Sequence, residues 1–148
     1  MLIFLDIDGV LVPAAGWKAP QLLEDGFPMF TSKATKALQQ LLSDTTTIIL
    51  STSHRNRFTI DQWKTIFKNR GLNIGSLKLL ASNYNSRKDE ILGWFNTHNV
   101  HEDFVIIDDD TTLNALPQYL KEHLILTSPL VGLTSEHVAE IKSSLHTA

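Results

Sequence analysis

Apolar runs that end in polar residues recur along the chain. The segment 2–7 is an apolar run that ends in carboxylates and is followed by Gly9, a pattern typical of a buried parallel strand before a turn. Four further strands are predicted at residues 46–50, 77–81, 104–107 and, from a weaker pattern, 124–126. These five segments are the candidate sheet.

Helical patterns separate these strands. Thr31 or Ser32 can cap a helix that runs to about Ser43, with an apolar face of Ala34, Leu38, Leu41 and Leu42. Residues 59–62 have capping-box spacing and open a second helix, whose apolar stripe is Ile60, Trp63 and Phe67 and whose C-terminal cap is Gly71.

Two more helices follow in the second half of the chain. Ser86 and Asp89 open a third helix, and its inner face is expected to carry Ile91, Phe95 and His98. Thr134 or Ser135 caps the last helix. The stretch between residues 108 and 123 is expected to be irregular.

This alternation predicts an α/β fold: a three-layer α/β/α sandwich around a Rossmann-like parallel sheet of about five strands. With 148 residues, of which 43% are hydrophobic, the chain is expected to form a single domain over residues 1–148. In such sheets ligands bind beyond the carboxyl ends of the strands.

Composition narrows the chemistry. The formal net charge of −3 gives no global attraction to nucleic acid or to an anionic membrane. Cysteine is absent, which excludes disulfides, thiolate metal sites and a cysteine nucleophile. The apolar start lacks a basic leader, and no later run reaches transmembrane length, so the expected location is the cytoplasm.

Polar residues follow three of the predicted strands. They are Asp6 and Asp8, then Ser51, Thr52 and Ser53, and finally Asp108 and Asp109. Carboxylates massed at one edge of a sheet repel each other and resist desolvation, so they are tolerable chiefly around a divalent cation. Hard oxygen ligands favour Mg²⁺.

The segment Ile3-Phe-Leu-Asp-Ile-Asp-Gly-Val-Leu11 closely resembles the first motif of haloacid dehalogenase (HAD) superfamily phosphatases. The resemblance implies that Asp6 is a nucleophile that forms an aspartyl-phosphate. It implies that Asp8 is the general acid and base, and that its backbone carbonyl helps to hold Mg²⁺. Gly9 is then expected beside the phosphoryl group.

Ile48-Ile-Leu-Ser-Thr-Ser-His-Arg55 resembles the second motif, in which a strand-end hydroxyl and the following amide bind the phosphoryl group. Thr52 is the favoured hydroxyl, with Ser53 supplying the amide, and Ser51 stays open. The third motif is a cation near the start of a helix, for which Arg87 and Lys88 both fit.

Val105-Ile-Ile-Asp-Asp109 resembles the fourth motif in its paired-aspartate form. The resemblance makes Asp109 the direct metal ligand and Asp108 its support, and Asp110 is expected to be exposed. Each pattern also has a plainer interpretation: the aspartates as solvated turns, and the Ser/Thr run as a helix lead-in. An EF-hand fails, because Trp17 occupies the glutamate position.

Three side chains near these motifs need no catalytic role. Trp63 and Trp94 lie near helical apolar stripes, which favours core packing over base stacking. His54 follows the second motif and could touch substrate, although a loop or capping histidine is more common.

The chain has no room for a cap domain. Residues 13–30 form only a flap-sized loop, with Trp17, Lys18 and Pro20, and the connection 81–86 is shorter. An open site suits a large substrate, or a cap supplied by a partner. Residues 54–70 hold five basic side chains against Asp61, a balance of +4 that could guide a phosphorylated polymer, although a solvated helix face explains part of it.

Ser53-His-Arg55 also resembles compact HAD domains associated with RNA repair. We therefore expect a Mg²⁺-dependent phosphatase whose partner is a phosphorylated substrate, either a nucleotide or a nucleic-acid end. Phosphoproteins and small phosphometabolites stay open as substrates, and so does a catalytically idle binding module with the same fold.

Overall fold

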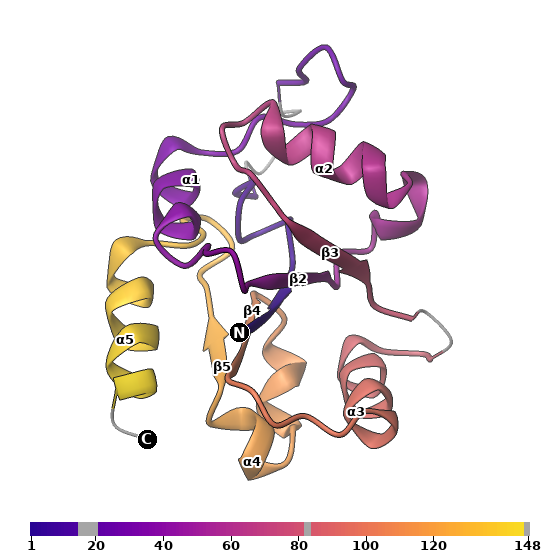
Figure 1. Ribbon diagram of the computed structural model, residues 1–148, viewed down its shortest axis with the longest axis vertical. Helices are drawn as coiled ribbons and strands as arrows, with labels where there is room; N and C mark the ends of the chain where they lie inside the picture. The colour runs from indigo at the N-terminus through magenta and orange to yellow at the C-terminus, as the bar shows by residue number, and fades with distance from the viewer. Residues whose placement is uncertain (15–20, 82–83, 147–148) are drawn as a thin grey trace.

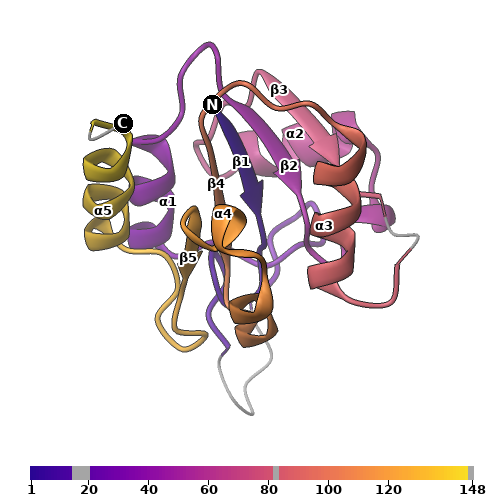
Figure 2. The same cartoon turned by 90° about the horizontal axis from the view of Figure 1, so that it is seen from below.

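Five strands form one parallel sheet in the order β3-β2-β1-β4-β5 (Figures 1 and 2, with all five strands labelled in Figure 2). Their bounds are β1 Leu2–Leu5, β2 Thr47–Leu50, β3 Ser76–Leu79, β4 Phe104–Asp108 and β5 Leu124–Leu126. This computed structural model describes residues 1–14, 21–81 and 84–146. The five strands predicted from the sequence are confirmed, with ends that shift by at most two residues.

Four helices join consecutive strands: α1 Ser32–Gln39, α2 Ile60–Lys68, α3 Arg87–Thr97 and α4 Gln118–Lys121. A fifth, α5 Ser135–His146, follows β5. The predicted N-caps are confirmed: Thr31 accepts from the Ala34 amide, and residues 59 and 62 form the capping box. The first helix is shorter than predicted: it ends at Gln39, because the amides of Leu41 and Leu42 donate to carbonyls three residues back and not four.

The segment between β4 and β5 is not irregular, as predicted, but contains the 3₁₀ helix Thr111–Ala115 and then α4. Asp110 begins the 3₁₀ helix, since its carboxylate accepts from the amide and the hydroxyl of Thr112. This capping role leaves Asp110 partly buried, where exposure was predicted.

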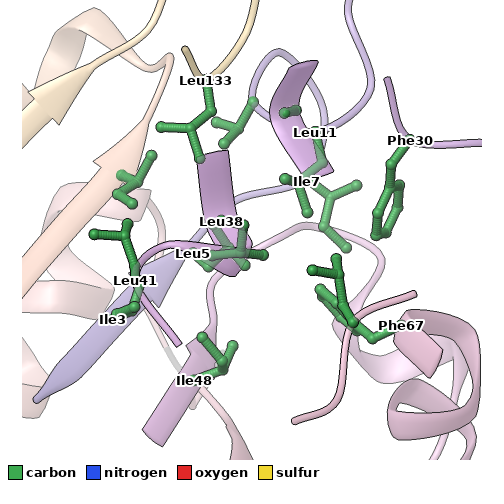
Figure 3. Close-up of a cluster of buried hydrophobic side chains, with 14 of the residues drawn as sticks. Ile3, Leu5, Ile7, Leu11, Phe30, Leu38, Leu41, Ile48, Phe67 and Leu133 are labelled. Carbon is green, nitrogen blue, oxygen red and sulfur yellow. The ribbon is translucent and has the colours of Figure 1, made fainter. Parts of the chain in front are cut away.

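The larger core lies on one face of the sheet, under α1, α2 and α5 (Figures 1 and 2). Alternate strand residues such as Ile3, Leu5 and Ile48 point into it and meet Leu38 and Phe67 from the helices (Figure 3). Trp63 is fully buried here, which confirms its predicted packing role.

The opposite face carries Phe4, which packs edge-on against Trp94 of α3 with ring centroids 5.0 Å apart. Helix α3 covers this face together with the segment that contains α4 (Figure 2). The prediction for His98 is wrong: α3 ends at Thr97, so His98 is exposed and stacks on the outer side of Trp94.

The register of the sheet brings the strand ends to one level. Leu5 pairs with Leu50 on one side and with Ile107 on the other. The next residues of these strands, Asp6, Ser51 and Asp108, therefore lie at the same edge of the sheet.

Among the described residues, no helix is both long and apolar enough to cross a membrane.

Candidate active site

Three aspartates meet at the carboxyl edge of the two central strands. Asp6 follows β1, Asp108 ends β4, and Asp109 comes next in the chain. Each contributes a carboxylate oxygen to a set whose members all lie within 4.8 Å of one another. Asp6 is held in line by its amide, which donates to the Ile107 carbonyl at 3.1 Å. The predicted convergence of these strand ends is present.

Burial makes this cluster electrostatically costly. Asp6 is 5% exposed and Asp108 is fully buried. Desolvation, together with the neighbouring charge of Asp108, raises the pKa of Asp6 to about 8. Burial likewise raises the pKa of Asp108. Positive charge placed between these two buried carboxylates would stabilise their ionised forms.

Arg87, at the first position of α3, supplies one such charge. Its Nη1 donates to Asp108 Oδ2 at 2.5 Å and lies 3.7 Å from Asp6 Oδ1. Burial alone would lower the pKa of Arg87, but the charges of Asp108 and Asp6 outweigh it and raise that pKa. Lys88 does not line the cavity, so the structure brings Arg87, and not Lys88, into the cluster.

Asp8 lies apart from the three clustered aspartates. Residues 7–12 form a tight turn in which the Ile7 carbonyl accepts from three successive amides. This turn carries the Asp8 carboxylate towards solvent, with 57% of the side chain exposed, where its Oδ2 lies 2.8 Å from His54 Nε2. Asp8 was predicted to bind metal through its backbone carbonyl, and that role stays a prediction.

Gly9 allows the turn to pass close to Asp109. Its φ of +79° suits glycine, and a Cβ on Gly9 would lie 2.1 Å from Asp109 Oδ2. The Gly9 carbonyl accepts from the Thr127 hydroxyl at 2.7 Å. Thr127 was not among the predicted site residues. The sequence could have indicated it, because Thr127 is the polar residue directly after the last strand.

The hydroxyls after β2 differ in exposure. Ser53 is exposed and lines the cavity, whereas Thr52 is fully buried and its hydroxyl accepts from the His54 amide. Ser51 is also buried, and its Oγ has no hydrogen-bond partner among the described residues. The phosphate-binding roles predicted for Thr52, Ser53 and Gly9 stay predictions.

The basic segment 54–70 is less of a surface patch than its sequence predicts. Arg55 is 4% exposed, is paired with Glu90 of α3, and donates to the carbonyls of Ser51 and Thr52. Arg70 is also buried, paired with Asp25 at 2.7 Å. Two of the five basic side chains therefore build the fold, and guidance of a phosphorylated polymer by this segment stays a prediction.

The aspartates line an open cavity of about 430 Å³, together with Ser53, Arg87 and Thr111. No large cap covers it within residues 1–14, 21–81 and 84–146. The predicted flap residues Trp17, Lys18 and Pro20 lie outside the described residues.

The donor set fits a hard divalent cation. Asp6, Asp108 and Asp109 supply only oxygen atoms, as such cations prefer, and the raised pKa values of the first two report carboxylates crowded without enough compensating charge. Asp109 is partly exposed, as a ligand open to an arriving ion would be.

Comparison with known families identifies the fold. A family model described as "HAD domain in Swiss Army Knife RNA repair proteins" matches residues 2–138. No curated protein and no solved structure shows significant similarity to the chain. The matched region contains all five strands and every aspartate of the cluster. The chain therefore belongs to this family of compact domains in the haloacid dehalogenase superfamily, whose fold is associated with phosphatase-like hydrolases.

Proposed function

We propose that this protein is a Mg²⁺-dependent phosphomonoesterase that works through an aspartyl-phosphate on Asp6. The observation that carries the proposal is the juxtaposition of three carboxylates, from Asp6, Asp108 and Asp109, with the Arg87 guanidinium at the carboxyl edge of the sheet. HAD domains generally use Mg²⁺, and these carboxylates are the residues that would hold it.

The reaction divides between two carboxylates of this chain. Bound Mg²⁺ would supply charge neutralisation between the nucleophile and the phosphoryl oxygens. Asp6 attacks phosphorus, the bond from phosphorus to the ester oxygen breaks, and Asp8 gives its proton to that oxygen. Asp8 then takes a proton from the water that attacks the aspartyl-phosphate, which releases phosphate and restores Asp6.

The remaining polar groups serve the phosphoryl charge. Arg87 holds Asp108 in place and sits close enough to Asp6 to face the transferred group. Ser53 is on the cavity surface, and the Thr52 hydroxyl still has a proton to donate. We assign Arg87 rather than Lys88 to the third motif on this geometry.

For the substrate we propose a phosphorylated nucleic-acid end, with a free nucleotide as the smaller alternative. Two observations support this choice: the family's description as a domain of RNA repair proteins, and a cavity with no large cap among the described residues. The basic segment adds less, because Arg55 and Arg70 are buried in ion pairs.

The experiment measures phosphate release with Mg²⁺ and with EDTA for the parent chain, Asp6→Asn and Asp8→Asn. Exposed Asp44, away from the cavity, gives the matched control Asp44→Asn. The substrates are p-nitrophenyl phosphate, oligoribonucleotides with a 3′- or 5′-phosphate, nucleoside monophosphates and a phosphopeptide. We expect metal-dependent turnover that both site variants lose. Absence of turnover on the whole panel would favour a binding module, and preference for the phosphopeptide would contradict the proposed substrate.

A further inference from the structure

His54 lies between Asp8, the proposed acid/base residue, and Arg57. Its Nε2 lies 2.8 Å from Asp8 Oδ2, and its Nδ1 lies 3.1 Å from Arg57 Nη1. The ring packs edge-on against Phe27, with centroids 5.8 Å apart and an interplanar angle of 85°. Both ring nitrogens are thus engaged, and the side chain is only 31% exposed.

These contacts fix which ring nitrogen carries the proton. A guanidinium has donors and no acceptor, so Arg57 can only donate, and Nδ1 of His54 must accept. The ring proton therefore lies on Nε2, which donates to Oδ2 of Asp8. Oδ2 of Asp8 is occupied by this hydrogen bond, whereas Oδ1 accepts none from the residues that the structure describes.

We propose that His54 is a positioning residue for Asp8: it binds Oδ2 and thereby turns Oδ1, the atom that gives and takes the proton, towards the cavity. Arg57 holds the ring in the tautomer that can do this. The inference rests on the proposed function and adds to it two residues that the aspartate motifs do not include. No proton moves through His54, since the transferred proton travels between Asp8 Oδ1 and the leaving oxygen or water.

A positioning role can be separated from a structural one by the leaving group. p-Nitrophenolate leaves without needing a proton, whereas an alkoxide needs one from Asp8 as the bond to phosphorus breaks. A misplaced Asp8 therefore lowers kcat/KM for an alkyl phosphate and spares kcat/KM for p-nitrophenyl phosphate. The later step, in which Asp8 takes a proton from water, is common to both esters and does not enter this constant. General loss of folded protein lowers both rates equally.

The experiment compares kcat/KM for p-nitrophenyl phosphate and for a simple alkyl phosphomonoester, since this constant covers the chemistry through cleavage of the phosphorus–oxygen bond. For His54→Ala we expect the alkyl ester to lose about tenfold and the aryl ester less than about twofold, as only part of the acid's contribution is lost. His54→Gln keeps a donor amide near the position of Nε2 and should recover most of the loss. Arg57→Leu should give a smaller loss of the same selective kind.

His101→Ala, at an exposed histidine outside the cavity, is the matched control and should leave both rates unchanged. Equal losses on the two esters in His54→Ala, no loss on either, or a failure of His54→Gln to recover the alkyl rate would each overturn the assignment. An inactive parent chain would instead contradict the proposed function, and the role of His54 would fall with it.

Discussion

Gly9 and Asp109 approach each other so closely that a single methyl group on Gly9 would lie 2.1 Å from the carboxylate oxygen Oδ2 of Asp109. Gly9 belongs to the turn that carries Asp8, and Asp109 belongs to the three-aspartate cluster. The turn that carries Asp8 can therefore pack against the aspartate cluster only because Gly9 has no side chain.

Gly9→Ala should displace Asp109 and weaken Mg²⁺ binding as well as stability. Gly26→Ala is the matched control: Gly26 has a similar φ of +80°, but nothing lies within 4 Å of its added Cβ. The control isolates the backbone strain, which costs about 1 kcal/mol. Chemical denaturation and Mg²⁺ titration should show a larger loss for Gly9→Ala in both measurements. Equal losses of stability and of Mg²⁺ affinity in the two variants would contradict a role for the close approach of Gly9 to Asp109.

Arg87 and Lys88 are neighbours with different fates. Arg87→Met should lower kcat/KM by about 100-fold or more, because it leaves Asp108 buried without its partner and removes a charge from the phosphoryl site. Lys88→Met should stay within about threefold of the parent, since Lys88 does not line the cavity. Steady-state kinetics on both variants decides the matter, and a larger effect at Lys88 would reverse the assignment.

Stability without metal should fall as the pH rises. The pKa of Asp6 is raised from 3.8 to about 8 in the folded protein, so the unfolded chain loses this proton first, and stability declines between about pH 4 and pH 8. Asp6→Asn removes this contribution. In EDTA at pH 8 it should raise the free energy of unfolding by about 1–2 kcal/mol, and the melting temperature should rise with it. Mg²⁺ should stabilise the parent more than the variant. A destabilised Asp6→Asn would contradict the crowding argument.

Asp25 should behave in the opposite way. Its hydrogen bonds with Arg70 lower the pKa of Asp25 to about 2, so its contribution to stability is complete above about pH 4 and is lost as the pH falls through about 2. Asp25→Asn should cost about 2 kcal/mol at pH 7, as hydrogen bonds to charged groups do. Urea denaturation across this range should show the gap closing in acid; a constant gap would contradict the pairing.

The sequence was sufficient for the sheet because apolar runs that end in Asp or Ser/Thr mark both a strand and its carboxyl end. Adjacent strands with paired register then force Asp6 and Asp108 together without any further information. Caps such as Thr31 and Ser86 were readable for the same reason, since capping depends on a few neighbouring residues.

Contacts between distant segments were not readable. The pairing of His54 with Asp8 spans 46 positions and depends on how two loops pack, and the burial of Arg55 depends on Glu90 of a different helix. The local excess of basic residues therefore placed Arg55 in a surface patch, because its partner Glu90 lies far along the chain. The choice between Arg87 and Lys88 also needed the helix orientation that only the folded structure supplies.

The most direct test of the central claim is chemical identification of the phosphorylated residue. The protein is mixed with Mg²⁺ and excess substrate, quenched in acid and reduced with borohydride, which converts an aspartyl-phosphate into homoserine, and the peptides are mapped by mass spectrometry. We predict homoserine at position 6, dependent on both substrate and Mg²⁺. Turnover without homoserine at position 6, or with homoserine at another aspartate instead, would contradict the assignment of Asp6 as the nucleophile.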